Sequence, residues 1–132
     1  MTSNTNLQKK LLLVDDDEMH LSIAELYLKG EFGIFKAKSG SEALECLCNG
    51  QFVPDLILLD IIMPEMDGWE VFSKIKGIAL LKNTPIVFFT SVDDESSKKK
   101  AYELGAVDYI TKPFKMISML DKVKDILSAH SI

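Results

Sequence analysis

The sequence predicts an α/β protein with a single doubly wound parallel sheet, in which five strands alternate with five helices. Two observations lead to this prediction. Short apolar segments recur along the 132-residue chain, and segments with helical periodicity lie between them. The apolar segments lack polar–apolar alternation, which is typical of parallel strands buried on both faces. Parallel strands need crossover connections, and the intervening helices supply them.

The first strand is expected at residues 11–14, which are all apolar and stop abruptly at four acidic residues. The first helix is expected at residues 18–29, with Gly30 as its C-cap. Its predicted apolar stripe consists of residues at helical spacing, namely Met19, Ile23, Leu26 and Tyr27.

Residues 33–37 are expected to form the second strand, and the second helix is expected to open at Ser41. The apolar face predicted for this helix consists of Ala43, Leu44, Leu47 and Cys48. The third strand, residues 56–59, resembles the first and also ends on an aspartate, Asp60.

A third helix is expected at residues 69–76, after a loop rich in turn-forming residues. The fourth strand, residues 85–89, closes at Thr90. Acidic and serine side chains at residues 93–96 favour a helix start, because they cap free N–H groups and suit the positive end of the helix dipole. Gly105 is expected to end that helix.

The fifth strand is expected at residues 107–111, where Pro113 stops it, and the last helix at residues 114–128. Its predicted apolar face consists of Phe114, Ile117, Leu120, Val123 and Leu127. Residues 1–8 are polar and are expected to form a flexible tail. One domain is therefore predicted for residues 9–129, with no output domain after it.

The composition excludes several classes of protein. Twenty acidic side chains against fifteen lysines and arginines give a net charge of −5, so no nucleic acid is expected to bind directly. No apolar run approaches the roughly 20 residues of a membrane helix, and no secretory signal opens the chain. Cys46 and Cys48 point in different directions on a helix and are expected to be reduced thiols of a cytoplasmic protein.

Polar side chains follow four of the expected strands. They are Asp15 and Asp16, Asp60, Thr90 and Lys112. In a parallel sheet these strand ends lie along one edge, where open α/β proteins bind ligands. Three carboxylates at one edge repel one another unless a cation neutralises them, and oxygen ligands suit Mg²⁺. The sequence therefore predicts a magnesium site.

A magnesium ion beside a carboxylate, a hydroxyl and an ammonium is suited to phosphoryl transfer. Asp60 is the candidate nucleophile, since a carboxylate can attack phosphorus. Each residue also has a structural interpretation, because aspartates often cap helices and Asp17 is expected to do only that. The common position of these residues at successive strand ends favours the functional interpretation.

Four blocks of the sequence resemble the receiver domain of two-component response regulators, as in the chemotaxis single-domain receiver. They are residues 14–17, 60–68, 90–91 and 108–114. The resemblance extends from about Lys10 to Leu127. It implies a flavodoxin-like fold with strand order 2-1-3-4-5 and a cis peptide bond between Lys112 and Pro113.

The resemblance also implies a role for each site residue. Asp60 accepts a phosphoryl group from a phosphohistidine on a histidine kinase or a histidine phosphotransfer protein. The expected Mg²⁺ ligands are Asp15, Asp16, Asp60 and the backbone carbonyl of Ile62. Thr90 and Lys112 hold the phosphoryl group, and Thr90 and Tyr109 form a switch. The switch alters the surface of residues 95–128, which meets an unknown downstream protein target, and no membrane partner is expected.

Two positions near the expected phosphoryl group are apolar in this chain, Ile62 and Val92. In the family these positions flank the path of the water that hydrolyses the acyl phosphate. No side chain at either position can orient that water, so we hypothesise a long-lived phosphoryl group. His20 follows the acidic cluster, and a non-catalytic surface role is expected for it.

Three other interpretations are weighed against a free-standing receiver. The chain could be a receiver segment of a larger hybrid histidine kinase or transcriptional regulator. A haloacid-dehalogenase-like phosphatase also uses an aspartate nucleophile with Mg²⁺, but it needs a second acid where this chain has Ile62. A flavodoxin-like electron carrier needs a phosphate-binding loop after the first strand, where the acidic residues 15–18 would repel phosphate.

Overall fold

The computed structural model describes residues 8–50 and 52–130. Five parallel strands form one sheet in the predicted order β2-β1-β3-β4-β5. The strands are β1 (Lys10–Val14), β2 (Gly33–Ala37), β3 (Leu56–Leu59), β4 (Ile86–Thr90) and β5 (Asp108–Thr111). The helices are α1 (Glu18–Leu28), α2 (Gly40–Cys48), α3 (Gly68–Lys76), α4 (Glu95–Leu104) and α5 (Met116–Ala129), with a short 3-10 helix, η2 (Ala79–Leu81), after α3.

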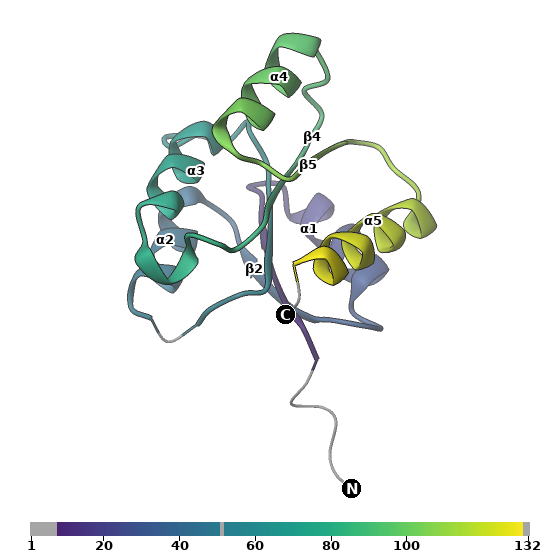
Figure 1. Cartoon of the computed structure of the whole chain (residues 1–132). Coiled ribbons are helices and arrows are strands. Elements are labelled where there is room, and N and C mark those ends of the chain that lie inside the picture. Colours follow the sequence, from purple (N-terminus) through teal and green to yellow (C-terminus); the bar gives the residue numbers. More distant parts are fainter. Residues whose placement is uncertain (1–7, 51, 131–132) are drawn as a thin grey trace, which may run out of the picture.

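Helices cover both faces of the sheet, which explains why its central strands are apolar throughout. Leu12 and Val14 of β1 face one side and pack in a core with residues of α2, α3 and α4. Leu11 and Leu13 face the other side and pack with α1 and α5. Figure 1 shows α2 and α3 on one side of the sheet and α1 and α5 on the other. Alternate side chains of one strand thus enter two separate cores.

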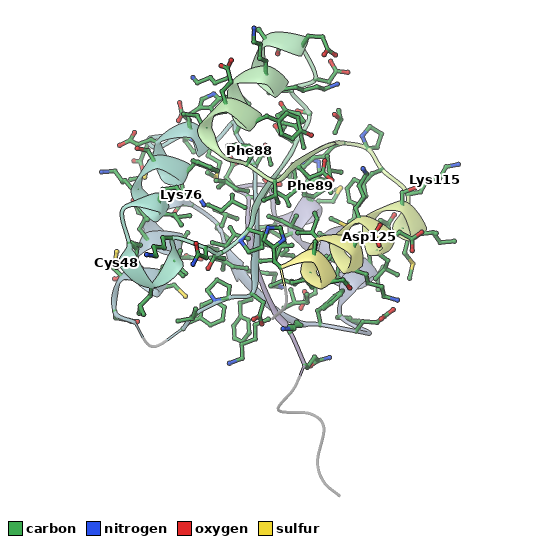
Figure 2. All side chains as sticks on the ribbon, in the orientation of Figure 1. Cys48, Lys76, Phe88, Phe89, Lys115 and Asp125 are labelled. Carbon is green, nitrogen blue, oxygen red and sulfur yellow. The ribbon has the colours of Figure 1, made fainter. Side chains whose placement is uncertain are left out.

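Two adjacent aromatic residues of β4 illustrate this division. The Phe88 ring packs on the α3 side, 5.5 Å from the ring of Phe72. The Phe89 ring packs on the other side, 4.4 Å from the ring of Phe114. Both lie in the interior in Figure 2, whereas Lys115 lies at the periphery.

Helix α1 turns a different apolar stripe to the sheet from the one predicted. The helix carries two apolar stripes, and packing against the sheet and α5 decides which is buried. Met19 and Leu26 of the predicted stripe are 69% and 61% exposed. The residues that α1 buries are Leu21, Ala24 and Leu28.

The ends of two helices also differ from the predictions. Helix α1 is capped by Lys29 in a right-handed conformation, so Gly30 is not the left-handed cap that was expected. Helix α2 starts after Ser39, whose hydroxyl accepts a backbone N–H of the first turn, and not at Ser41. Gly105 does end α4 in the left-handed conformation, with a φ of 112°, as predicted.

Helices α2 and α5 each expose one residue of their predicted apolar faces. Cys48 of α2 is exposed, and Ile117 of α5 is 73% exposed, off the helix face that Met119, Val123 and Leu127 bury. Met119 is fully buried in its place, together with Val123 and Leu127 as predicted. Apart from Gln8, the predicted tail lies outside the described residues. No helix within residues 8–50 and 52–130 is long and apolar enough to cross a membrane.

Candidate functional site

Four of the predicted site residues lie at the carboxyl edge of the sheet. Asp15 and Asp60 directly follow β1 and β3, Thr90 ends β4, and Lys112 directly follows β5. The backbone N–H groups of Asp15, Asp60 and Lys112 donate to carbonyls of the neighbouring strand at 3.1, 3.0 and 2.8 Å. The sheet ladder therefore fixes the backbone from which each of these side chains projects.

Three carboxylates form an acidic cluster at this edge. Asp15, Asp16 and Asp60 each offer one oxygen, and these oxygens lie within 4.8 Å of one another. Asp15 and Asp60 are buried, while Asp16 is exposed. Burial raises the pKa of the Asp15 carboxyl, against the opposing effect of Lys112. An all-oxygen donor set with excess negative charge fits a hard divalent cation such as Mg²⁺.

Lys112 compensates part of this negative charge. Its ammonium nitrogen lies 2.5 Å from Asp15 Oδ2 and 3.4 Å from Asp60 Oδ2, and its side chain is 7% exposed. The ammonium also lies 4.9 Å from the centre of the Phe89 ring. One cation beside three carboxylates leaves the cluster with net negative charge.

Thr90 and Tyr109, the expected switch residues, bind the same backbone segment. The buried Thr90 hydroxyl accepts the N–H of Val92 at 3.3 Å. The Tyr109 hydroxyl donates to the carbonyl of Val92 at 2.6 Å. Burial raises the pKa of Tyr109 to about 12, so the hydroxyl keeps its proton at neutral pH. The Tyr109 ring is buried beside Phe88, and the Thr90 and Tyr109 side chains thus both hold Val92 in place.

The loop after Asp60 packs closely on the start of α3. The backbone N–H of Ile61 donates to Asp60 Oδ1 at 2.7 Å, and the N–H of Gly68 donates to the carbonyl of Ile61 at 2.8 Å. A Cβ atom on Gly68 would lie 2.2 Å from the Asp60 carbonyl oxygen, so no other residue fits without a backbone shift. Ile62, in the same loop, has a 62% exposed side chain.

His20 is a member of the site that the sequence analysis missed. Its Nδ1 lies 3.0 Å from Lys112 Nζ and 3.7 Å from Asp15 Oδ2. It stands in the first turn of α1, behind the N-cap Asp17, which caps this helix as predicted. The available signal was its place in the first turn after a site strand, where side chains lean back toward the helix N-terminus.

An apolar groove opens beside Lys112. Its lining includes Met19, Ile23 and Tyr27 of α1 and Phe114 from the segment before α5. Ile23 is 38% exposed, and Met19 belongs to the stripe that α1 leaves outside the core. Three residues of the predicted apolar stripe of α1 therefore line this groove, and of these Tyr27 also packs against the core.

Comparisons with known proteins agree with this geometry. The model of the response regulator receiver domain family matches residues 11–124. The chain belongs to this family. It is 40% identical over 124 residues to the chemotaxis protein CheY of Halobacterium salinarum, covering 93% of this chain and all of that protein. It is 38% identical to the regulatory protein VanR of Enterococcus faecium over 89% of this chain, and there it spans about half of the relative's length.

Solved structures show the same fold. A putative response regulator from Chloroflexus aurantiacus superposes with a TM-score of 0.84 at 34% identity, covering 92% of this chain and 98% of that one. CheY4 of Vibrio cholerae superposes with a TM-score of 0.82 at 27% identity, over 90% of this chain and 98% of that chain. The predicted flavodoxin-like fold of a receiver is thus confirmed, and the cis peptide bond between Lys112 and Pro113 is present.

Membership in this family sets the general role of the chain. Receiver domains are modules of two-component signalling and not classical enzymes, and response regulators interact with histidine kinases and with downstream targets. This favours the receiver interpretation over the phosphatase and the electron carrier.

Proposed function

We propose that this receiver accepts a phosphoryl group on Asp60 from a phosphohistidine of a histidine kinase or a histidine phosphotransfer protein. The convergence of Asp15, Asp16, Asp60 and Lys112 on one point, from three separate strand ends, supports the proposal. Asp15, Asp16, Asp60 and the backbone carbonyl of Ile62 would hold Mg²⁺. Residues 9–129 form the receiver in this proposal.

In the transfer step, an oxygen of the Asp60 carboxylate attacks the phosphorus of the donor. The P–N bond breaks, and its electron pair stays on the donor imidazole. The Lys112 ammonium, already 3.4 Å from Asp60 Oδ2, offsets the negative charge on the phosphoryl oxygens, and the Thr90 hydroxyl donates to one of them. Bound Mg²⁺ supplies further positive charge at the same place.

The shared contacts of Thr90 and Tyr109 suggest how phosphorylation changes the surface. The phosphoryl group adds charge and strong acceptors beside Thr90. When the Thr90 hydroxyl turns to the phosphoryl group, it releases the N–H of Val92, the residue whose carbonyl accepts the Tyr109 hydroxyl. The loop before α4 then takes a new position, and the surface formed by residues 95–128 changes for a downstream protein target.

The test is the localisation of the added group. The protein is incubated with a small phosphodonor and Mg²⁺, and its intact mass is measured before peptide mapping. We expect one acid-stable, hydroxylamine-sensitive phosphoryl group on Asp60, absent in Asp60→Ala and present in the matched control Asp93→Asn. Label that persists in Asp60→Ala would refute the proposal.

We also propose a cytoplasmic location with no direct nucleic-acid or membrane partner. Cys46 and Cys48 are free thiols, which suits a reducing compartment, and the net charge of −5 opposes binding to anionic surfaces. Fractionation of cells that express the protein tests the location.

A further inference from the structure

Lys112 has three hydrogen-bond acceptors around its ammonium group, and one of them is His20. Oδ2 of Asp15, Nδ1 of His20 and Oδ2 of Asp60 lie 2.5, 3.0 and 3.4 Å from Lys112 Nζ. An ammonium carries three protons and no acceptor, so these three atoms match its capacity. His20 is the only one of the three that is not a carboxylate, and neither the strand ends nor the proposed metal ligands include it.

The direction of the contact fixes the tautomer of His20. Because the ammonium can only donate, Nδ1 must accept, and the ring proton is on Nε2. The nearest carboxylate oxygens, on Asp15 and Asp17, lie 3.7 and 3.6 Å from Nδ1, beyond hydrogen-bond distance. At the start of α1 the backbone N–H of His20 donates to Asp17 Oδ1 at 3.3 Å, which helps to fix the helix turn from which the ring projects.

The three acceptors have different roles in the proposed function. Asp15 and Asp60 are both proposed metal ligands, and Asp60 also takes the phosphoryl group. Mg²⁺ prefers oxygen ligands, so the imidazole of His20 is not drawn to the metal. His20 is therefore the one acceptor that keeps its contact with Lys112 while the two carboxylates serve the metal and the phosphoryl group.

From these contacts we propose that His20 is a positioning residue for phosphoryl acceptance, holding the Lys112 ammonium beside Asp60. The inference rests on the proposed function and adds one residue to it. A free lysine side chain samples many rotamers, and a fixed acceptor reduces the entropy lost when the ammonium meets the phosphoryl group. Without His20, Lys112 is held less well once Asp15 has turned to the metal.

The first test is a spectroscopic one on the metal-free protein. Long-range ¹H–¹⁵N correlation spectra report which ring nitrogen of each histidine carries the proton. His20 is expected as the Nε2–H tautomer. His130 provides an internal contrast, because its Nδ1 lies 2.9 Å from the carbonyl of Ile126 and must donate. A proton on Nδ1 of His20 would overturn the inference without touching the proposed function.

The second test is kinetic and uses matched variants. His20→Ala should slow phosphorylation of Asp60 by a small donor about five- to tenfold, the size expected for the loss of one hydrogen bond of ordinary net strength. In His20→Asn the amide oxygen stands where Nδ1 stands and should restore the rate to within about twofold. His20→Gln carries its oxygen one bond further and should not restore the rate. Ser22→Ala, at an exposed position of the same helix outside the groove, should leave the rate unchanged.

The outcomes separate the two claims. If the wild-type protein takes no label on Asp60, the proposed function fails. If the wild-type protein is labelled and His20→Ala is labelled as fast, only the positioning role of His20 fails. Equal rates for His20→Asn and His20→Gln would also contradict the positioning role, because the rate would then not depend on the position of the acceptor atom.

Discussion

The two buried residues of the acidic cluster meet two opposing requirements. Asp15 and Asp60 are buried among apolar strand ends, yet both must stay charged to bind a cation. Burial raises the pKa of Asp15, and a buried carboxylate is tolerated here because Lys112 and backbone N–H groups surround the pair. The site thus holds unfavourable charge that a bound cation would relieve.

We hypothesise that the apolar side chains of Ile62 and Val92 lengthen the lifetime of the phosphoryl group on Asp60. Ile62→Asn and Val92→Glu each introduce a polar group able to orient water, so each should speed loss of the phosphoryl group about tenfold or more. The measurement is the decay of the phosphorylated protein in Mg²⁺ after donor removal. Val92 is half-buried against the core, so Val92→Leu is the apolar control and should decay at the wild-type rate. Unchanged decay in both polar variants would contradict the hypothesis.

At the scale of elements, the start of α3 is fixed by the close approach of Gly68 to the Asp60 backbone. In Gly68→Ala the new Cβ meets the Asp60 carbonyl oxygen and, at 2.7 Å, the Ile61 Cα, neither of which can move freely. We expect this variant to lose about 2 kcal/mol of unfolding free energy. Urea denaturation gives the value. Gly30→Ala is the matched control, since no atom lies within 4 Å of its new Cβ, and equal stabilities of the two variants would show that the contact is unimportant.

The start of α4 makes stability depend on acid pH through Asp94. Hydrogen bonds from Ser96 and Ser97 lower the pKa of this N-cap from its ordinary 3.8 to about 2. Since the pKa is lower in the folded state, the contribution is fully present above about pH 4 and is lost as the pH falls through about 2. Asp94→Asn keeps an N-cap without this titration.

Urea denaturation from pH 7 to pH 2 tests this prediction. The difference in unfolding free energy between wild type and Asp94→Asn should shrink below about pH 4. Asp93→Asn, one residue outside the cap, should follow the wild-type curve. A difference that is constant with pH would mean that Asp94 titrates alike in the folded and unfolded chains.

Sequence reasoning succeeded where the backbone alone decides position. Asp15, Asp60 and Lys112 could be placed together because a parallel sheet brings successive strand ends to one edge, whatever the packing. It failed where tertiary packing chooses between equivalent patterns, as in the two apolar stripes of α1. His20 was missed because its contact joins residues 92 positions apart and depends on side-chain direction at a helix start.

At the scale of the whole molecule, the acidic edge is a place where repulsion between like charges lowers the stability of the fold. The two cores on either side of the sheet are apolar, and the concentrated negative charge lies where β1 and β3 end. The exposed Asp16 adds charge to this cluster without adding to either core. A cation that binds the folded chain and not the unfolded chain should therefore stabilise the entire domain.

Thermal unfolding with and without Mg²⁺ measures that coupling. By mass action, Mg²⁺ at about 100 times its Kd should add about 2.7 kcal/mol to the unfolding free energy of the wild-type protein. Asp16→Asn should lose most of this gain, yet be no less stable without metal, because it removes an exposed carboxylate that repels Asp15 and Asp60. Asp121→Asn, an exposed aspartate on α5, should keep the full gain. Equal Mg²⁺ responses in all three proteins would mean that the cation acts elsewhere than at the acidic cluster.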